Sequence, residues 1–117
     1  MPKLGVNIDH AASLRQLRQG IEPEIVSCVI LCEAAGCDSI VAHLREDQRH
    51  IRENDVYLLK KVVKTRFNLE MSVNKKIVDI ACIAKPHQAT LVPERRHEVT
   101  TEGGLDVVAN FKKISDV

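Results

Sequence analysis

The chain has 117 residues, with 17 lysines and arginines against 16 acidic residues, so it suits a single domain and offers no electrostatic surface for nucleic acid. Its few aromatic residues, Tyr57, Phe67 and Phe111, provide no stacking platform for single strands. No basic segment followed by an apolar one opens the chain, and no apolar run approaches the ~18 residues of a membrane span, so we expect a soluble cytoplasmic protein.

Short apolar runs recur along the chain with the length and composition of strands. They are Leu4–Ile8, Ser39–Ala42, Arg66–Leu69 and Ala89–Val92. Because alternation between apolar and polar residues is lost in them, we expect strands of a parallel sheet that are buried on both faces. Each run is followed by polar residues that could bind a ligand or transfer protons. In chain order these are Asp9 with His10, the segment that begins at His43, then Glu70, and finally Glu94.

Helical spacing fills the intervals between these runs. Glu24–Ala35 has apolar residues at steps of three and four and is closed by Gly36, which is typical of the end of a helix. A second helix is expected over Asp55–Lys64, with Asn54 or Asp55 as its cap, and a third over Asn74–Ala84, which Lys85 and Pro86 end. The last piece, from Leu105 onward, has the pattern of a helix that is just beginning.

The alternation of strand and helix predicts the α/β class with parallel crossovers. Polar residues at successive strand ends are typical of a TIM barrel, because its βα-loops converge on one face. A doubly wound open sheet is the rival, but its usual Gly-x-Gly-x-x-Gly turn is absent from the chain. We therefore predict the TIM (β/α)8 barrel family, with residues 1–117 as one domain that supplies about four βα units, the amino-terminal half of a barrel.

A half barrel has consequences for association. A complete barrel needs roughly 200 to 250 residues, so the first and fourth strands here would be open edges. We also expect residues that face the barrel interior to lose the half that buries them, and an exposed apolar patch favours association. Examples of such residues are Val6, Ile8, Val41 and Leu69.

The segment His43–His50 contains two histidines, two arginines and two carboxylates directly after a predicted strand. Such a set can bind an oxyanion and move protons near neutral pH, since histidine titrates there. A solvated charged loop is the alternative interpretation. A metal-dependent hydrolase that uses His43, Asp47 and His50 as ligands is a rival function, although the neighbouring arginines argue against a cation.

Cysteines and the remaining histidines favour structural roles. Cys28, Cys32, Cys37 and Cys82 form no Cys-x-x-Cys pair, so we expect small buried core residues in a reducing compartment. His87 lies at the start of a predicted strand, away from the active end of a barrel, and is expected to be structural. We expect no metal and no cofactor.

Linked motifs along the whole chain resemble one enzyme family. They keep their order and spacing, and are Gly5–His10, His43–Asp47, Arg49–Ile51, Asn68–Met71, Lys85–His87, Leu91–Glu94 and Glu98–Asp106. This pattern is similar to the amino-terminal half of the pyridoxine 5'-phosphate synthases. The resemblance implies a transferase of vitamin B6 biosynthesis, a TIM barrel that is usually octameric. That family condenses 1-deoxy-D-xylulose 5-phosphate with 3-amino-2-oxopropyl phosphate to pyridoxine 5'-phosphate, phosphate and water.

The resemblance also implies roles for individual residues. His43 and Glu70 match proton acceptors, and five residues match contacts to the xylulose phosphate, namely Asp9, His10, Arg45, His50 and Thr100. Asn7 and Arg18 match contacts to the amino-ketone phosphate. Around Arg18 the sequence departs from the family pattern, with Gln19 after the arginine and Ile25 where proline is common.

The family's third catalytic histidine and its glycine-rich phosphate site belong to the second half of the barrel. We therefore expect the family's activity of a complete protein, acting on small phosphorylated substrates as a homo-oligomer, and expect residues 1–117 alone to be inactive. A non-catalytic half barrel that binds a phosphorylated metabolite or partner subunits is the alternative.

Overall fold

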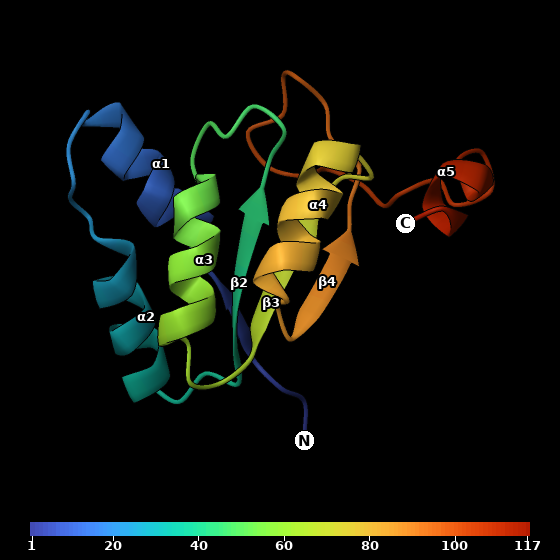
Figure 1. The fold of residues 1–117 in the computed structure, drawn as a ribbon. Helices are drawn as coiled ribbons and strands as arrows, with labels where there is room; N and C mark the ends of the chain where they lie inside the picture. The colour runs from blue at the N-terminus through green and yellow to red at the C-terminus, as the bar shows by residue number, and fades with distance from the viewer.

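The computed structural model describes all residues 1–117. Its strands and helices alternate along most of the chain (Figure 1). In order they are β1 Gly5–Asn7, α1 Asp9–Leu17, α2 Ile25–Ala34, β2 Ser39–Leu44, α3 Glu53–Val62, β3 Phe67–Met71, α4 Lys75–Ala84, β4 Gln88–Leu91 and α5 Phe111–Ser115. The predicted α/β class is confirmed.

The strands form one parallel sheet in the order β1-β2-β3-β4. Its register pairs Asn7 with Val41 and His43 with Glu70. Glu70 is paired in turn with Thr90. Consecutive strands are therefore neighbours, and their carboxyl ends lie at one edge of the sheet, which is the arrangement expected of half a barrel. β1 and β4 are the two unpaired edges.

Helices α1 to α4 cover one face of the sheet, and the other face is open (Figure 1). Burial therefore alternates along β3, where Phe67, Leu69 and Met71 are buried and Asn68 and Glu70 are half-buried. The expectation of strands buried on both faces was wrong, because only one layer of helices is present.

The open face of the sheet is mainly polar. It carries Asn68, whose side chain accepts a hydrogen bond from Thr90 Oγ1 at 2.9 Å, and the two site residues His43 and Glu70. Ile8 and Leu69 belong instead to the buried core on the helix side, and Val6 packs against that core. The prediction that Ile8 and Leu69 would be uncovered was wrong, whereas Val6 and Val41 are half-buried.

Two helix predictions are met closely. Asn74 caps α4, with its side chain accepting from Lys76 N at 2.9 Å, and Lys85 ends the helix in the left-handed conformation. Gly36 follows α2 with a φ of +93°, a conformation that favours glycine.

Three helical features differ from the sequence expectations. Helix α1 was not predicted, and α5 begins only at Phe111. Helix α3 begins at Glu53, so neither Asn54 nor Asp55 is its cap residue. Asp55 nevertheless satisfies the helix start, since its Oδ2 accepts from Arg52 N at 2.9 Å.

All four cysteines are free. Cys37 is buried, while Cys28 and Cys32 are half-buried against the core. Cys82 is exposed on α4, so the expectation of burial was wrong for it. None of the helices has the length and apolar character needed to cross a membrane.

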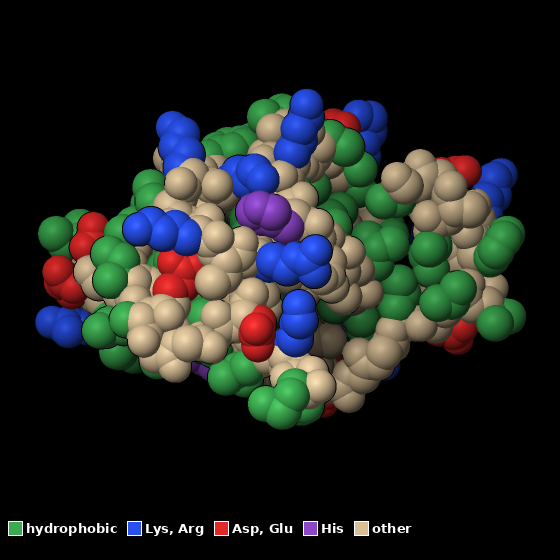
Figure 2. Space-filling model, turned by 90° about the horizontal axis from the view of Figure 1, so that it is seen from below, with side chains coloured by type: hydrophobic (Ala, Val, Ile, Leu, Met, Phe, Trp, Pro, Cys, Tyr) green, Lys and Arg blue, Asp and Glu red, His purple; other side chains and the backbone are tan.

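The end of the molecule where the strands begin is basic. Figure 2 shows this end, with lysine and arginine side chains gathered around a histidine. The loops before β3 and β4 supply Lys64, Arg66, Lys85 and His87. His87 Nδ1 accepts from Phe67 N at 3.1 Å, which agrees with the structural role expected for this residue.

Candidate active site

A cavity of about 330 Å³ lies at the carboxyl ends of the strands, and nine of its ten lining residues are polar or charged. It is lined by Asn7, Asp9, His10, His43, Arg45, His50, Glu70, Val99, Thr100 and Thr101. The structure thus brings together every predicted site residue except Arg18. Arg18 ends α1 as its exposed cap residue, outside this cavity. The roles assigned to all these residues remain predictions.

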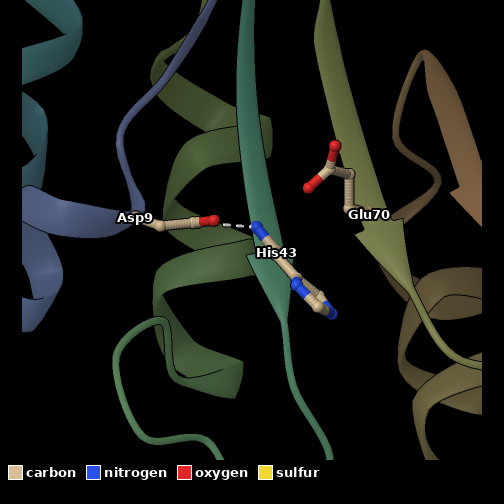
Figure 3. A group of neighbouring side chains, drawn as sticks. All are labelled: Asp9, His43 and Glu70. Carbon is tan, nitrogen blue, oxygen red and sulfur yellow. Dashed lines mark hydrogen bonds between the residues drawn. The ribbon is translucent and has the colours of Figure 1, made fainter. Parts of the chain in front are cut away.

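Asp9 joins the end of β1 to β2. It is buried at the first turn of α1, and its Oδ1 accepts from His43 N at 2.7 Å (Figure 3). Asn7 and Asp9 are also bonded to each other, since Asn7 Nδ2 donates to Asp9 Oδ2 at 2.9 Å and Asp9 N donates to Asn7 Oδ1 at 2.7 Å. These contacts fix a carboxylate beside the ring of His43.

Glu70 lies across the sheet register from His43. Burial raises the pKa of its carboxyl above the usual value, and the nearby negative charge of Asp9 adds to this, while His43 acts in the opposite direction. A carboxyl with a raised pKa is a stronger base than an exposed one, so Glu70 can accept a proton more readily.

A buried pair connects β2 to the segment after β4. His43 Nε2 lies 2.9 Å from Glu94 Oε1, and the two side chains are 5% and 9% exposed. Glu94 Oε2 accepts from Glu46 N at 3.3 Å. Glu94 was noticed as a polar residue at a strand end but was not predicted as a site residue. Its position after β4 was the available signal.

His50 faces the cavity as a buried imidazole. Its Nδ1 accepts from Ile51 N at 2.8 Å, so the ring proton of the neutral form lies on Nε2. Burial lowers the pKa of His50, and His43 and Arg45 lower it further, against the opposing effects of Asp9 and Asp47. His50 is therefore suited to donate a hydrogen bond while it remains neutral.

Two arginines hold Asp47 and the chain after β4. Arg45 donates to Asp47 at 3.3 Å and to Arg95 O at 3.0 Å through Nε and NH2, and no group of the chain accepts from its NH1 group. Arg49 donates to Asp47 at 2.7 Å and to Glu98 O at 2.8 Å. The guanidinium groups of Arg49 and Arg45 hold the pKa of Asp47 well below its usual range.

This arrangement contradicts the metal set of His43, Asp47 and His50, because Asp47 is bonded to two arginines. A different group, Asp9, His43 and Glu70, has potential ligand atoms that all lie within 4.8 Å of one another (Figure 3). Carboxylate and imidazole can hold a divalent cation. The same groups can exchange protons, and the guanidinium of Arg45 in the cavity wall favours an anion there.

Fold and cavity together define a parallel α/β protein with a polar cavity at the carboxyl ends of its strands, where histidines and carboxylates lie beside an arginine. The chain belongs to the family described as pyridoxal phosphate biosynthesis protein PdxJ, whose sequence model matches residues 4–117. This membership places it in the biosynthesis of vitamin B6.

Curated relatives carry the name pyridoxine 5'-phosphate synthase. The protein of Trichodesmium erythraeum is 56% identical over 117 residues, which are 100% of this chain and 49% of the relative. That of Pelobacter propionicus is 53% identical over 116 residues, 99% of this chain and 48% of the relative. That of Synechocystis is 56% identical over 118 residues, and the match covers 100% of this chain and 49% of the relative. The chain spans about half the length of the curated relatives it matches.

Proposed function

We propose that residues 1–117 form the amino-terminal half of a (β/α)8 barrel with pyridoxine 5'-phosphate synthase activity. The complete protein would condense 1-deoxy-D-xylulose 5-phosphate with 3-amino-2-oxopropyl phosphate to pyridoxine 5'-phosphate, phosphate and water. The observation that carries this proposal is the convergence on one cavity of residues that match the family pattern. The name that the relatives carry, pyridoxine 5'-phosphate synthase, supports it.

The reaction joins an amine to a ketone, eliminates phosphate and closes an aromatic ring, so protons must be moved several times. In our proposal His43 and Glu70 accept protons from adjacent strand ends. The proposed ligands of the xylulose phosphate are Asp9, His10, Arg45, His50 and Thr100.

Arg45 would meet the phosphate or a substrate oxygen through its free NH1 group, while its other contacts keep the guanidinium in place. His50 would add a neutral Nε2–H donor. We assign Asn7 and Arg18 to the amino-ketone phosphate, Arg18 from outside the cavity described above. In the complete protein we further propose a cytoplasmic homo-oligomer.

Titration calorimetry of residues 1–117 with 1-deoxy-D-xylulose 5-phosphate tests the binding half of the proposal. We expect saturable binding that Arg45→Ala weakens about tenfold or more, since a charge-assisted hydrogen bond contributes about 1.5–3 kcal/mol. Arg66→Ala is the matched control, because Arg66 is exposed in the loop before β3. Equal loss in both variants would contradict a specific role for Arg45.

A coupled assay of inorganic phosphate release tests catalysis. With both phosphorylated substrates we expect turnover by a complete barrel that carries these residues and none by residues 1–117, since the family's third catalytic histidine has no counterpart among them. Binding without turnover in both preparations would favour the non-catalytic alternative. Turnover by residues 1–117 would contradict the assignment of an essential group to the other half.

A further inference from the structure

Glu94 contacts His43 from outside the cavity. The cavity lining includes His43 but not Glu94, which lies instead in a neighbouring surface pocket with Glu46, Asp47 and Arg95. Glu94 therefore contacts the imidazole without lining the cavity. A residue so placed can act on the proposed reaction through His43.

The hydrogen bond to Glu94 determines which nitrogen of His43 is free. A carboxylate can only accept, so the contact of 2.9 Å requires the proton on Nε2. In the neutral ring Nδ1 then holds the lone pair, and no group of the chain donates to it. The ring lies beside the carboxyl groups of Asp9 and Glu70, as Figure 3 shows.

Glu94 is itself held in place. Its second oxygen accepts from Glu46 N at 3.3 Å, and the next residue, Arg95, is tied to β2 because its carbonyl accepts from Arg45 at 3.0 Å. Burial of both partners keeps water from competing for the imidazole.

We propose that Glu94 is a positioning residue that keeps the proton of His43 on Nε2 and presents Nδ1 to the cavity as the proton-accepting atom. The catalytic part of this inference rests on the proposed function, in which His43 is a base. The hydrogen bond and the placement of the ring proton do not depend on it.

Nuclear magnetic resonance of histidine-¹⁵N-labelled residues 1–117 tests the proton's position. We expect a downfield proton on His43 Nε2 that exchanges slowly with water, and we expect Glu94→Ala to abolish this slow exchange. Glu46→Ala is the control, since Glu46 lies in the same surface pocket but bonds Ser72 through its side chain. A wild-type proton on Nδ1, or a signal that survives in Glu94→Ala, would overturn the proposal.

Two internal references and a second variant keep this experiment decisive. His50 and His87 accept backbone N–H bonds at Nδ1, so both should keep the Nε2–H form in every variant. Where Glu94→Ala does not fold, Glu94→Gln replaces it. A neutral acceptor should move the His43 Nε2 proton upfield, and an unmoved resonance would overturn the proposal.

Turnover of a complete barrel separates this inference from the function on which it rests. We expect Glu94→Gln to lower kcat about tenfold or more with little change in KM, and Glu94→Asp to restore part of the loss. If the spectra behave as proposed but kcat does not change, Glu94 still positions the ring and the proton role of His43 is wrong.

Discussion

Glu70 is the residue whose surroundings most clearly favour proton transfer, because burial and Asp9 raise the pKa of its carboxyl. In a complete barrel we expect Glu70→Gln to lower kcat about 10²–10⁴-fold, since glutamine keeps the size but cannot take the proton. The Kd of the substrate, measured separately, should change little. Glu102→Gln is the control at an exposed position, and wild-type turnover of Glu70→Gln would contradict the assignment.

His50 predicts a pH dependence of stability. Its pKa is lowered in the folded chain, so the unfolded chain binds the proton more readily as the pH falls through about 6.5. This residue's contribution to the free energy of unfolding should therefore be complete above that range and decrease below it.

Urea unfolding at about pH 7.5 and about pH 5.5 measures this dependence. His50→Asn can keep the hydrogen bond from Ile51 N and removes the titrating group, so its loss of stability on acidification should be smaller than in the wild type. His97→Asn, at an exposed position, should behave as the wild type does. An identical pH dependence in His50→Asn would refute the assignment.

At the scale of elements, a partly buried ion pair joins α1 to α3. Arg15 donates to both oxygens of Asp55, at 2.9 and 2.7 Å, and to His50 O at 3.1 Å. The two side chains are each 12% exposed. The pair therefore fixes the loop that carries His50 as well as the two helices.

We expect Asp55→Asn to lower the free energy of unfolding by about 3 kcal/mol, because it leaves Arg15 without its charged partner and weakens the start of α3. Asp79→Asn, which breaks the exposed pair of Lys75 and Asp79, should cost about 0.5 kcal/mol or less. Chemical denaturation measures both values. Equal losses of unfolding free energy in the two variants would show that the pair of Arg15 and Asp55 stabilises the fold no more than the exposed pair does.

Elements were predictable where local signals and burial agree. In α4 the cap Asn74 and the apolar face of Ile77 and Ile80 mark the same helix. Helix α1 lacks this agreement, because Asp9 and Ala12 are its only buried residues. Its place in the tertiary structure, rather than an apolar periodicity, therefore determines that this segment is helical. The faces of the strands also depend on which layers exist, which an apolar run of four or five residues does not reveal.

The site was predictable to the extent that it lies at strand ends. Asp9, His43 and Glu70 follow three apolar runs, and parallel order then brings them together. The pairing of His43 with Glu94 joins residues 51 positions apart. Whether a carboxylate at one strand end turns toward the cavity or toward its neighbour's ring depends on side-chain packing, which spacing does not determine.

At the scale of the whole molecule, the open edges of the sheet predict association. Val92 N donates to Met71 O, and because parallel strands alternate their hydrogen bonds, Ala89 N points to the free side of β4. We expect sedimentation to show residues 1–117 as dimers or larger species, through pairing of β4 with β1 of another copy.

Ala89→Pro is the matched variant, because it removes a free-edge donor without removing a bond to β3. It should shift the sedimentation profile toward the monomer, whereas Arg66→Ala, outside the strands, should leave it unchanged. A monodisperse wild-type monomer would contradict the expected association. Wild-type association that Ala89→Pro leaves intact would contradict pairing through β4.

The division of the sheet into an apolar face under helices and a polar open face separates two kinds of selection on the same strands. Phe67 and Leu69 hold the helices, while Asn68 and Glu70 between them contribute little to that core. A mutant library sorted for folding would therefore retain the first pair and allow the second to drift. A library sorted for growth without external vitamin B6, with these strands in a complete barrel, would also retain Glu70.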